Sequence, residues 1–348
     1  MLLPKIITFL LSGAALILAG DAPAQQDQPS AQKSNTAAIQ QAEQLLNAGK
    51  SDEALRILAN ISVTESSNKD VRHLLGLAYY QKADYARAIE HLSIAVKIET
   101  EDNLRYRQDV QMLGVSHYLI GHVKEAIPYL EQVKKWAPDN IEMSYTLGMS
   151  YIQTHDPDKS REAFARMFSV SAGSASAHLI NAKMMIRQQF EEFAEKELQK
   201  AIEIDSRLPE ANFLLGELAV YRADLERGIT LLKKEIAVNP GFAMAYYMLG
   251  EAYTRQLKWN EALEPLQKSI WLNPFFSGPY IVLGKVYLKK GELGTAESML
   301  RRALSRDPNN FSGHHLLAQV LQQSNRSEEA KKEFELADKL RTSSDKNQ

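Results

Sequence analysis

A stretch of 34 residues, which the rest of the chain repeats with variations, limits the fold more than any other feature of the sequence. This unit runs from Gly241 to Pro274 as GFAMAYYMLGEAYTRQLKWNEALEPLQKSIWLNP. Its first half carries aromatic, apolar or small residues at offsets 0, 3, 4 and 7 from Tyr246, a spacing that lines one face of a helix. Its second half repeats such a face from Ala262, and Pro274 then ends the helix because proline has no N–H to donate. One unit is therefore predicted to be helix, turn, helix and stop.

Gly250 needs a packing reason, since glycine inside a helix costs about 1 kcal/mol relative to alanine. We expect it to let the first helix approach Ala262 of the second helix, with Leu266 beside them. The small residue recurs at 34-residue steps, with one step of 38, as Ala42, Gly76, Gly114, Gly148, Ala182, Gly216, Gly250, Gly284 and Ala318. The second-helix position recurs as Ala54, Ala88, Ala126, Ser160, Ala194, Gly228, Ala262, Ala296 and Ala330.

This arrangement resembles the tetratricopeptide repeat, whose pattern is W-x2-L-G-x2-Y, then A-x3-F, then A and P over about 34 residues. The resemblance covers nearly all of the chain after its N-terminal segment. It implies an all-α, right-handed α-solenoid in which each repeat contacts mainly its neighbours. About nine repeats are expected, near residues 35–68, 69–102, 107–140, 141–174, 175–208, 209–242, 243–276, 277–310 and 311–341.

The N-terminal segment has the three-part order of a secretory signal peptide. Lys5 precedes the apolar run from Ile6 to Ala19, and Ala22-Pro23-Ala24 offers a cleavage site. The run is short for a membrane span, which needs about 20 residues. We therefore expect residues 1–24 to be removed, leaving no stable membrane span, and the protein to be exported to the periplasm, to the cell envelope or into the medium. An uncleaved N-terminal anchor is the alternative.

Several departures from the repeat pattern carry local predictions. Residues 25–34 are read as a flexible leader and residues 342–348 as a polar tail, because both are rich in polar residues. Four extra residues near Glu101 are expected to lengthen a helix or a loop. The stretch from Ser169 to Ser176 lacks proline and is predicted to be a weak junction or hinge. Glu235 replaces a small or apolar residue, and a slight helix rotation is expected to leave its carboxylate in water.

Composition narrows the possible functions. The net charge is -2, and no lysine or arginine cluster forms the basic stripe that nucleic acid would require. There is no cysteine, and the eight histidines show no metal-ligand spacing. No phosphate-cradling glycine loop and no nucleophile motif is present. We therefore expect no enzyme, no cofactor and no metal.

The resemblance implies that the first helices of successive repeats line a concave groove in which ligands lie. The residues expected to face it come six and three positions before the small residue and one, four and five after it. A partner-binding set follows from this rule, namely Tyr80, Tyr118, Tyr145, Met149, Phe213, Glu217, Tyr221, Tyr247, Glu251 and Arg255. Aromatic side chains suit such a role because they give contact area at low entropy cost. The alternative is that they pack on neighbouring first helices.

The predicted function is a non-enzymatic scaffold or adaptor that binds a peptide or protein segment in this groove, outside the cytoplasm. The alternative is an accessory subunit or a binding module for cell-envelope polysaccharide or for an export or assembly complex. The family's lysine and asparagine clamp for a C-terminal carboxylate has no match, because the corresponding positions hold His73, Leu77, Gln111 and Val115. The oligomeric state stays open.

Overall fold

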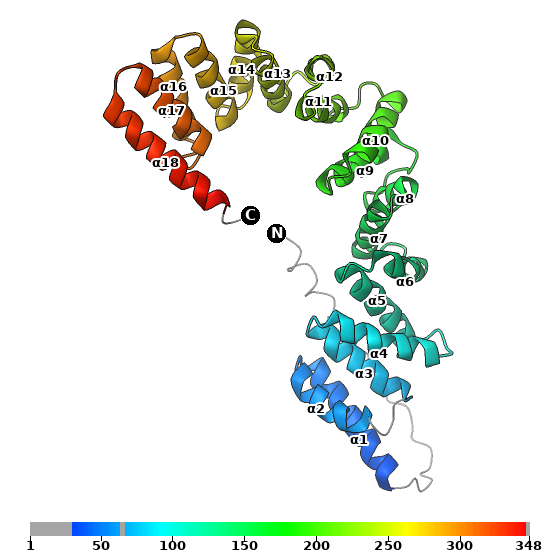
Figure 1. Ribbon diagram of the computed structural model, residues 1–348. Helices are drawn as coiled ribbons and strands as arrows, with labels where there is room; N and C mark the ends of the chain where they lie inside the picture. Colours follow the sequence, from blue (N-terminus) through cyan, green and yellow to red (C-terminus); the bar gives the residue numbers. More distant parts are fainter. Residues whose placement is uncertain (1–29, 63–66, 346–348) are drawn as a thin grey trace. The chain divides into compact units, whose positions relative to one another are not determined.

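The protein is described from a computed structural model, which covers residues 30–62 and 67–345. The predicted signal peptide, residues 1–24, lies outside these residues. Every regular element among the described residues is an α-helix (Figure 1). The prediction of an all-α solenoid of helical repeats is thereby confirmed.

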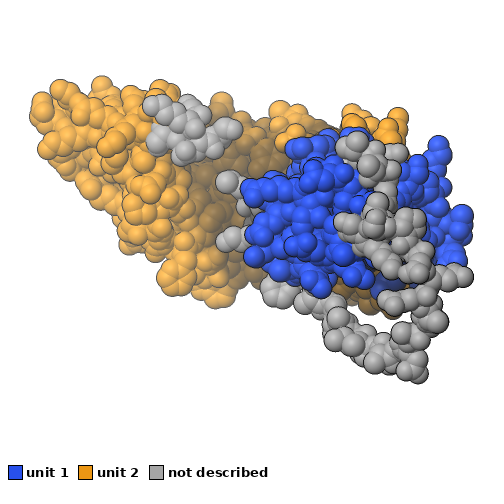
Figure 2. Space-filling model, turned by 90° about the horizontal axis from the view of Figure 1, so that it is seen from below, with its two compact units in different colours: residues 1–109 blue, residues 110–348 orange. Residues whose placement is uncertain are grey.

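The chain divides into two compact units, residues 1–109 and 110–348, which Figure 2 distinguishes by colour. Unit 1 contains α1 (Ser30–Asn47), α2 (Ser51–Ser62), α3 (Lys69–Gln81), α4 (Tyr85–Ile98) and the start of α5 (Leu104–Leu119). Unit 2 contains the rest of α5 together with α6 (Val123–Trp136), α7 (Ile141–Gln153), α8 (Pro157–Met167), α9 (Ala175–Arg187), α10 (Glu191–Ile204), α11 (Ala211–Tyr221), α12 (Leu225–Val238), α13 (Ala243–Arg255), α14 (Trp259–Leu272), α15 (Ser277–Lys289), α16 (Leu293–Leu304), α17 (Phe311–Gln323) and α18 (Ser327–Asp345).

Each odd-numbered helix packs on the even-numbered helix that follows it, as the helix-turn-helix pattern predicts. The small residues lie at this contact. A methyl group added at Gly250 would overlap the Leu266 side chain, and Ala262 and Leu266 are fully buried. The glycine therefore has the packing reason that the sequence indicates, with Leu266 as the nearest neighbour. The same overlap with a leucine of the second helix occurs at Gly76 and Gly284.

The turn between the two helices of a repeat contains a residue in the left-handed region. This residue lies seven positions after the small residue in all nine described helix pairs, but it is glycine in three of them only, namely Gly49, Gly121 and Gly291. Leu257 has φ 60° at the corresponding position. The repeat geometry imposes this conformation, because a left-handed residue is unfavourable for most side chains when taken alone.

Both predicted ends of the repeat region differ from the structure. Helix α1 begins at Ser30, so residues 30–34 are helical instead of belonging to a leader, and residues 25–29 lie outside the described part. Helix α18 continues to Asp345, so the predicted tail is helical up to that residue. Thr342 supports this extension by donating its hydroxyl to the Asp338 carbonyl at 2.6 Å. The four extra residues near Glu101 were expected to lengthen a helix or a loop. Helix α5, which begins at this place in the chain, has 16 residues where α3 and α7 have 13, so the helix is the longer element.

Glu235 was predicted to lie in water, and this prediction is wrong. Its side chain is fully buried, and its carboxylate accepts hydrogen bonds from the backbone N–H groups of Glu210 at 2.8 Å and Phe213 at 3.2 Å. These two groups lie at the start of α11, where Glu210 is left-handed and gives no side-chain cap. Glu235 of α12 therefore caps the helix that precedes its own, which satisfies the buried charge.

A second buried carboxylate, Glu197 of α10, belongs to a polar network between α8, α9 and α10. It accepts hydrogen bonds from Asn181 Nδ2 at 3.1 Å and Arg161 Nη1 at 3.3 Å, and it pairs with His178 Nδ1 at 2.9 Å. Arg161 also donates to the Ala172 carbonyl at 3.0 Å. That carbonyl belongs to the stretch predicted to be a hinge, and this bond ties the stretch to α8.

Candidate partner-binding face

The predicted partner-binding residues all come from odd-numbered helices, and we call the surface that they define the first-helix face. Each odd-numbered helix has one side on its second helix and the first-helix face on another side, because the chosen offsets recur with the helical period. In unit 2 the face includes residues of α5, α7, α11 and α13. Tyr80 lies on α3 of unit 1, where its ring meets Tyr85 edge-on at 5.8 Å between centroids.

Two of the predicted residues are buried. Met149 is 4% exposed and belongs to the core around Phe164, and Phe213 is 6% exposed. The Phe213 ring meets Phe242 edge-on at 4.9 Å between centroids. The expectation that these two side chains face a partner is therefore not met, because packing in the core leaves almost none of their surface free.

The face tyrosines of α5, α7 and α13, which are Tyr118, Tyr145 and Tyr247, are half-buried. Tyr118 and Tyr145 pack against the core around Phe164, and the Tyr145 ring lies edge-on to Phe164 at 6.3 Å. Tyr247 lies edge-on to Phe276 at 4.9 Å. Burial raises the pKa values of Tyr118 and Tyr247 above the ordinary tyrosine value. Each of these rings is therefore packed against the protein over part of its surface, as the alternative interpretation expects, and the rest of its surface is accessible.

Tyr221 differs from the other tyrosines of the face because it is 64% exposed. It ends α11, one helical turn after Glu217, and α11 contacts α13. Arg255 of α13 donates to the carbonyl of Val220, the residue before Tyr221, at 3.1 Å. This bond places the ends of the two helices next to each other. Tyr221 also contributes to the raised pKa of Tyr247, after burial and the charge of Glu251.

Two charges on this part of the face are paired, whereas that of Glu217 is not. Glu251 accepts a hydrogen bond from Arg255 at 3.0 Å, and Lys183 of α9 is bonded to Glu210 at 2.7 Å. The half-buried Glu217 carboxylate has no hydrogen bond or ion pair with any residue that the structure describes. Burial alone raises its pKa above the ordinary glutamate value. Glu217 is therefore an anionic group of the face whose charge no described residue balances.

The structure also reveals exposed aromatic residues that the repeat offsets did not select. Trp271 near the end of α14 is 72% exposed, and Phe275 in the following loop is 83% exposed. Lys268 lies over the Trp271 ring at 4.0 Å from its centroid. The corresponding positions of the preceding repeat hold Ala237 and Gly241. A comparison between repeats would have found these two residues, because nothing in the packing pattern requires an aromatic side chain there.

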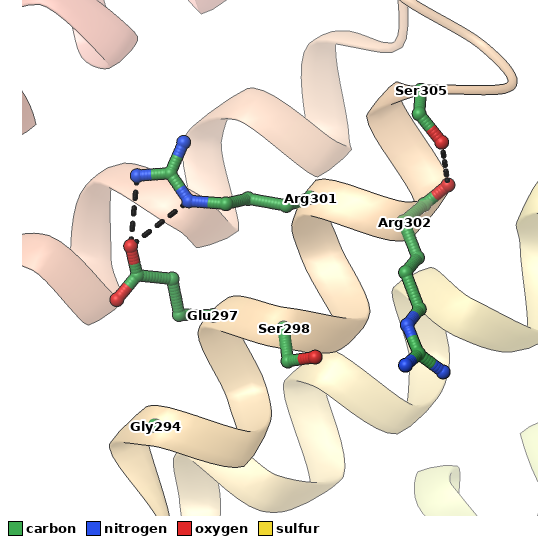
Figure 3. Close-up of a pocket in the computed structure, with 6 residues that line it drawn as sticks. All are labelled: Gly294, Glu297, Ser298, Arg301, Arg302 and Ser305. Atoms are coloured by element: carbon green, nitrogen blue, oxygen red, sulfur yellow. Dashed lines mark hydrogen bonds and ion pairs between the residues drawn. The ribbon is translucent and has the colours of Figure 1, made fainter.

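The hollow on α16 shown in Figure 3 does not provide a better site. It is open to solvent and is lined by residues of that helix and the residue after it, including Glu297, Arg301 and Arg302. Arg301 bonds to Glu297 at 2.8 Å, and Arg326 bonds to the same carboxylate at 2.8 Å. The acidic group of the hollow is therefore already neutralised.

No group of three or more histidine, cysteine, aspartate or glutamate side chains in residues 30–62 and 67–345 is arranged to hold a metal ion. Within the same ranges, no helix is long and apolar enough to cross a membrane.

Comparison with known proteins identifies the repeat. Sequence models of the tetratricopeptide repeat match residues 39–103, 111–140, 213–274 and 287–343. Together these segments make up more than half of the 348 residues. The chain belongs to the tetratricopeptide repeat family. Repeats of this family generally serve as scaffolds for protein–protein interactions and carry no catalytic site of their own.

The similarity to individual proteins is partial. The chain is 28% identical over 114 residues to the BBSome complex member BBS4 of Mus musculus, a match that covers 33% of this chain and 21% of that relative. The chain therefore spans about a fifth of the curated relative that it matches.

Solved structures with a similar helical arrangement include a MamA fragment from Desulfovibrio magneticus RS-1, at 21% identity and a TM-score of 0.45, covering 49% of this chain and 96% of that chain. The tetratricopeptide protein YrrB is 20% identical with a TM-score of 0.45, covering 52% and 93% of the two chains. The protein pilF of Pseudomonas aeruginosa is 18% identical with a TM-score of 0.46, covering 56% and 88%.

Proposed function

We propose that this protein is a non-catalytic scaffold that binds a peptide or protein segment on its first-helix face, and that it works outside the cytoplasm. The observation that supports the binding site most strongly is the exposure of Tyr221. This side chain is 64% exposed and lies beside the half-buried Tyr247. A tyrosine left this exposed adds nothing to the core of a repeat. It offers a partner an apolar ring with a polar tip, the combination that binding surfaces favour.

The site lies where two neighbouring repeats meet. Tyr221 comes from α11 and Tyr247 from α13, and the Arg255 bond to the Val220 carbonyl fixes the two helices against each other. A segment lying on this surface would contact side chains whose backbones are held in place by regular helices. Little ordering of the scaffold would then oppose binding. The exported location rests on the signal-peptide pattern of residues 1–24.

The test of the binding face compares two pairs of aromatic residues from adjoining parts of the chain. A Tyr221→Ala, Tyr247→Ala variant and a Trp271→Ala, Phe275→Ala variant each lose two rings, but only the first pair lies on the first-helix face. Peptides selected from a displayed random library on the wild-type protein serve as the probe. We expect the first variant to bind them at least tenfold more weakly, because aromatic hot-spot residues contribute about 2 kcal/mol or more.

The matched variant without Trp271 and Phe275 should retain wild-type affinity in isothermal titration calorimetry. Circular dichroism checks that both variants keep their helix content. Equal losses in the two variants, or no loss in either, would contradict the assignment of binding to the first-helix face.

A further inference from the structure

The unpaired charge of Glu217 bears on the chemistry of the ligand. The buried glutamates of the described residues have partners: Glu235 has two backbone N–H groups, and Glu197 has Arg161, His178 and Asn181. Glu217 is half-buried without one. A partly desolvated, unpaired carboxylate carries an electrostatic cost that an approaching cation would offset.

The surroundings of Glu217 suit a basic side chain. Tyr221 follows it by one helical turn on α11 and exposes 64% of its surface. The face of a tyrosine ring attracts an ammonium or a guanidinium group. Arg255, whose side chain reaches the carbonyl of the residue before Tyr221, is bonded both to Glu251 and to that Val220 carbonyl. The charge of Arg255 is therefore offset by Glu251.

We infer that Glu217, with Tyr221 and Tyr247, binds a lysine or arginine side chain of the partner segment. This inference rests on the proposed function, since it specifies one residue type in the segment that the first-helix face holds. The carboxylate would accept the charge-assisted hydrogen bond, while the tyrosine rings would cover the aliphatic stem of the lysine or arginine. A partner segment with an acidic or apolar residue at that position should be disfavoured.

Glu192 provides the control, because it is an exposed glutamate on α10, which is a second helix and contributes nothing to the first-helix face. The experiment selects peptides from a displayed random library on the wild type, on Glu217→Gln, on Glu217→Lys and on Glu192→Gln. Sequences retained by the wild type and by Glu192→Gln should be enriched in lysine and arginine over the input library. Glu217→Gln should lose this enrichment, and Glu217→Lys should enrich aspartate and glutamate instead.

A quantitative test measures the affinity of the wild type and of each variant for one selected basic peptide. Glu217→Gln should bind it roughly tenfold more weakly than the wild type, the effect of losing one hydrogen bond between charged groups. Glu192→Gln should change the affinity by less than about twofold, since Glu192 is exposed and lies outside the first-helix face. Glu217 has no partner among the described residues, so we expect its replacement to leave the fold intact.

The possible results distinguish a failure of this inference from a failure of the proposed function. Peptides that depend on Tyr221 and Tyr247 but show no basic enrichment would overturn the inference and leave the binding face intact. Peptides that bind the double tyrosine variant as well as the wild type would overturn the proposed function itself. Equal basic enrichment on the wild type and on Glu217→Gln would also contradict the role of Glu217.

Discussion

The interior of the repeats and the first-helix face treat their glutamates differently. Between packed helices, Glu197 and Glu235 are 2% and 0% exposed, and each carboxylate is held by two or more N–H groups. On the face, the half-buried Glu217 is held by no described residue. Since burying a charge is costly without partners, the hydrogen bonds of the interior carboxylates are needed for the stability of the fold. The carboxylate on the face is available to a ligand. Substitutions should therefore affect stability at the interior positions and binding at the face position.

The largest effect is expected from Glu197→Ala. This change leaves Arg161, His178 and Asn181 around an empty position, and breaking a buried ionic network from one side costs about 3–5 kcal/mol. The free energy of unfolding in urea measures the cost. The exposed Glu192 on the same helix is the control, and Glu192→Ala should change the stability by less than about 0.5 kcal/mol. Similar losses in both variants would remove the distinction between interior and surface glutamates.

A smaller effect is expected from Glu235→Ala, because its partners are two backbone groups. The N–H groups of Glu210 and Phe213 would then lack an acceptor in a buried place, at a cost of about 1–3 kcal/mol. Amide hydrogen exchange at the start of α11 should rise selectively, whereas the exposed neighbour change Lys234→Ala should leave it unchanged. Unaltered protection of the Phe213 amide would show that Glu235 does not cap this helix.

The helical repeat could be predicted because the small residue at the contact between its two helices recurs about every 34 residues. Close contact between the two helices requires a small residue on the first helix, so the recurring small position of Gly250 indicates the packing, and the structure fills the space beside it with the Leu266 side chain. The left-handed turn residues escaped prediction, since Leu257 and five other non-glycine residues hold a conformation that their own preferences oppose.

The site could be predicted only in part, because offsets along a helix do not report what a neighbouring loop covers. Phe213 occupies a face position and is nevertheless buried against Phe242, in the loop before α13. The sequence contains one indication that α11 needs a cap from elsewhere, which is the role of Glu235. Helices α3, α7 and α17 are capped by Asn68, Asn140 and Asn310, whereas α11 is preceded by Glu210, which gives no side-chain cap.

The smallest effect on stability, and the one of opposite sign, is expected from Glu217→Gln. Burial raises the folded-state pKa of Glu217 above its ordinary value of 4.5, so the folded state holds this proton more tightly than the unfolded state. Ionisation therefore lowers stability as the pH rises through the window that starts near 4.5 and ends at the raised folded-state pKa. At pH 7, which lies above the ordinary glutamate pKa, the glutamine variant should be more stable than the wild type, by about 0.5 kcal/mol or less.

The stability difference between Glu217→Gln and the wild type should shrink as the pH falls below that window, where both side chains are neutral. Thermal unfolding of the two proteins across this pH range measures it, with Glu251→Gln as the control. Because Glu251 is bonded to Arg255, its replacement should not stabilise the protein. A Glu217→Gln variant that is less stable than the wild type at pH 7 would mean that the carboxylate has a partner within the fold. A variant that is more stable and binds basic peptides more weakly would indicate that Glu217 serves binding at a small cost to folding.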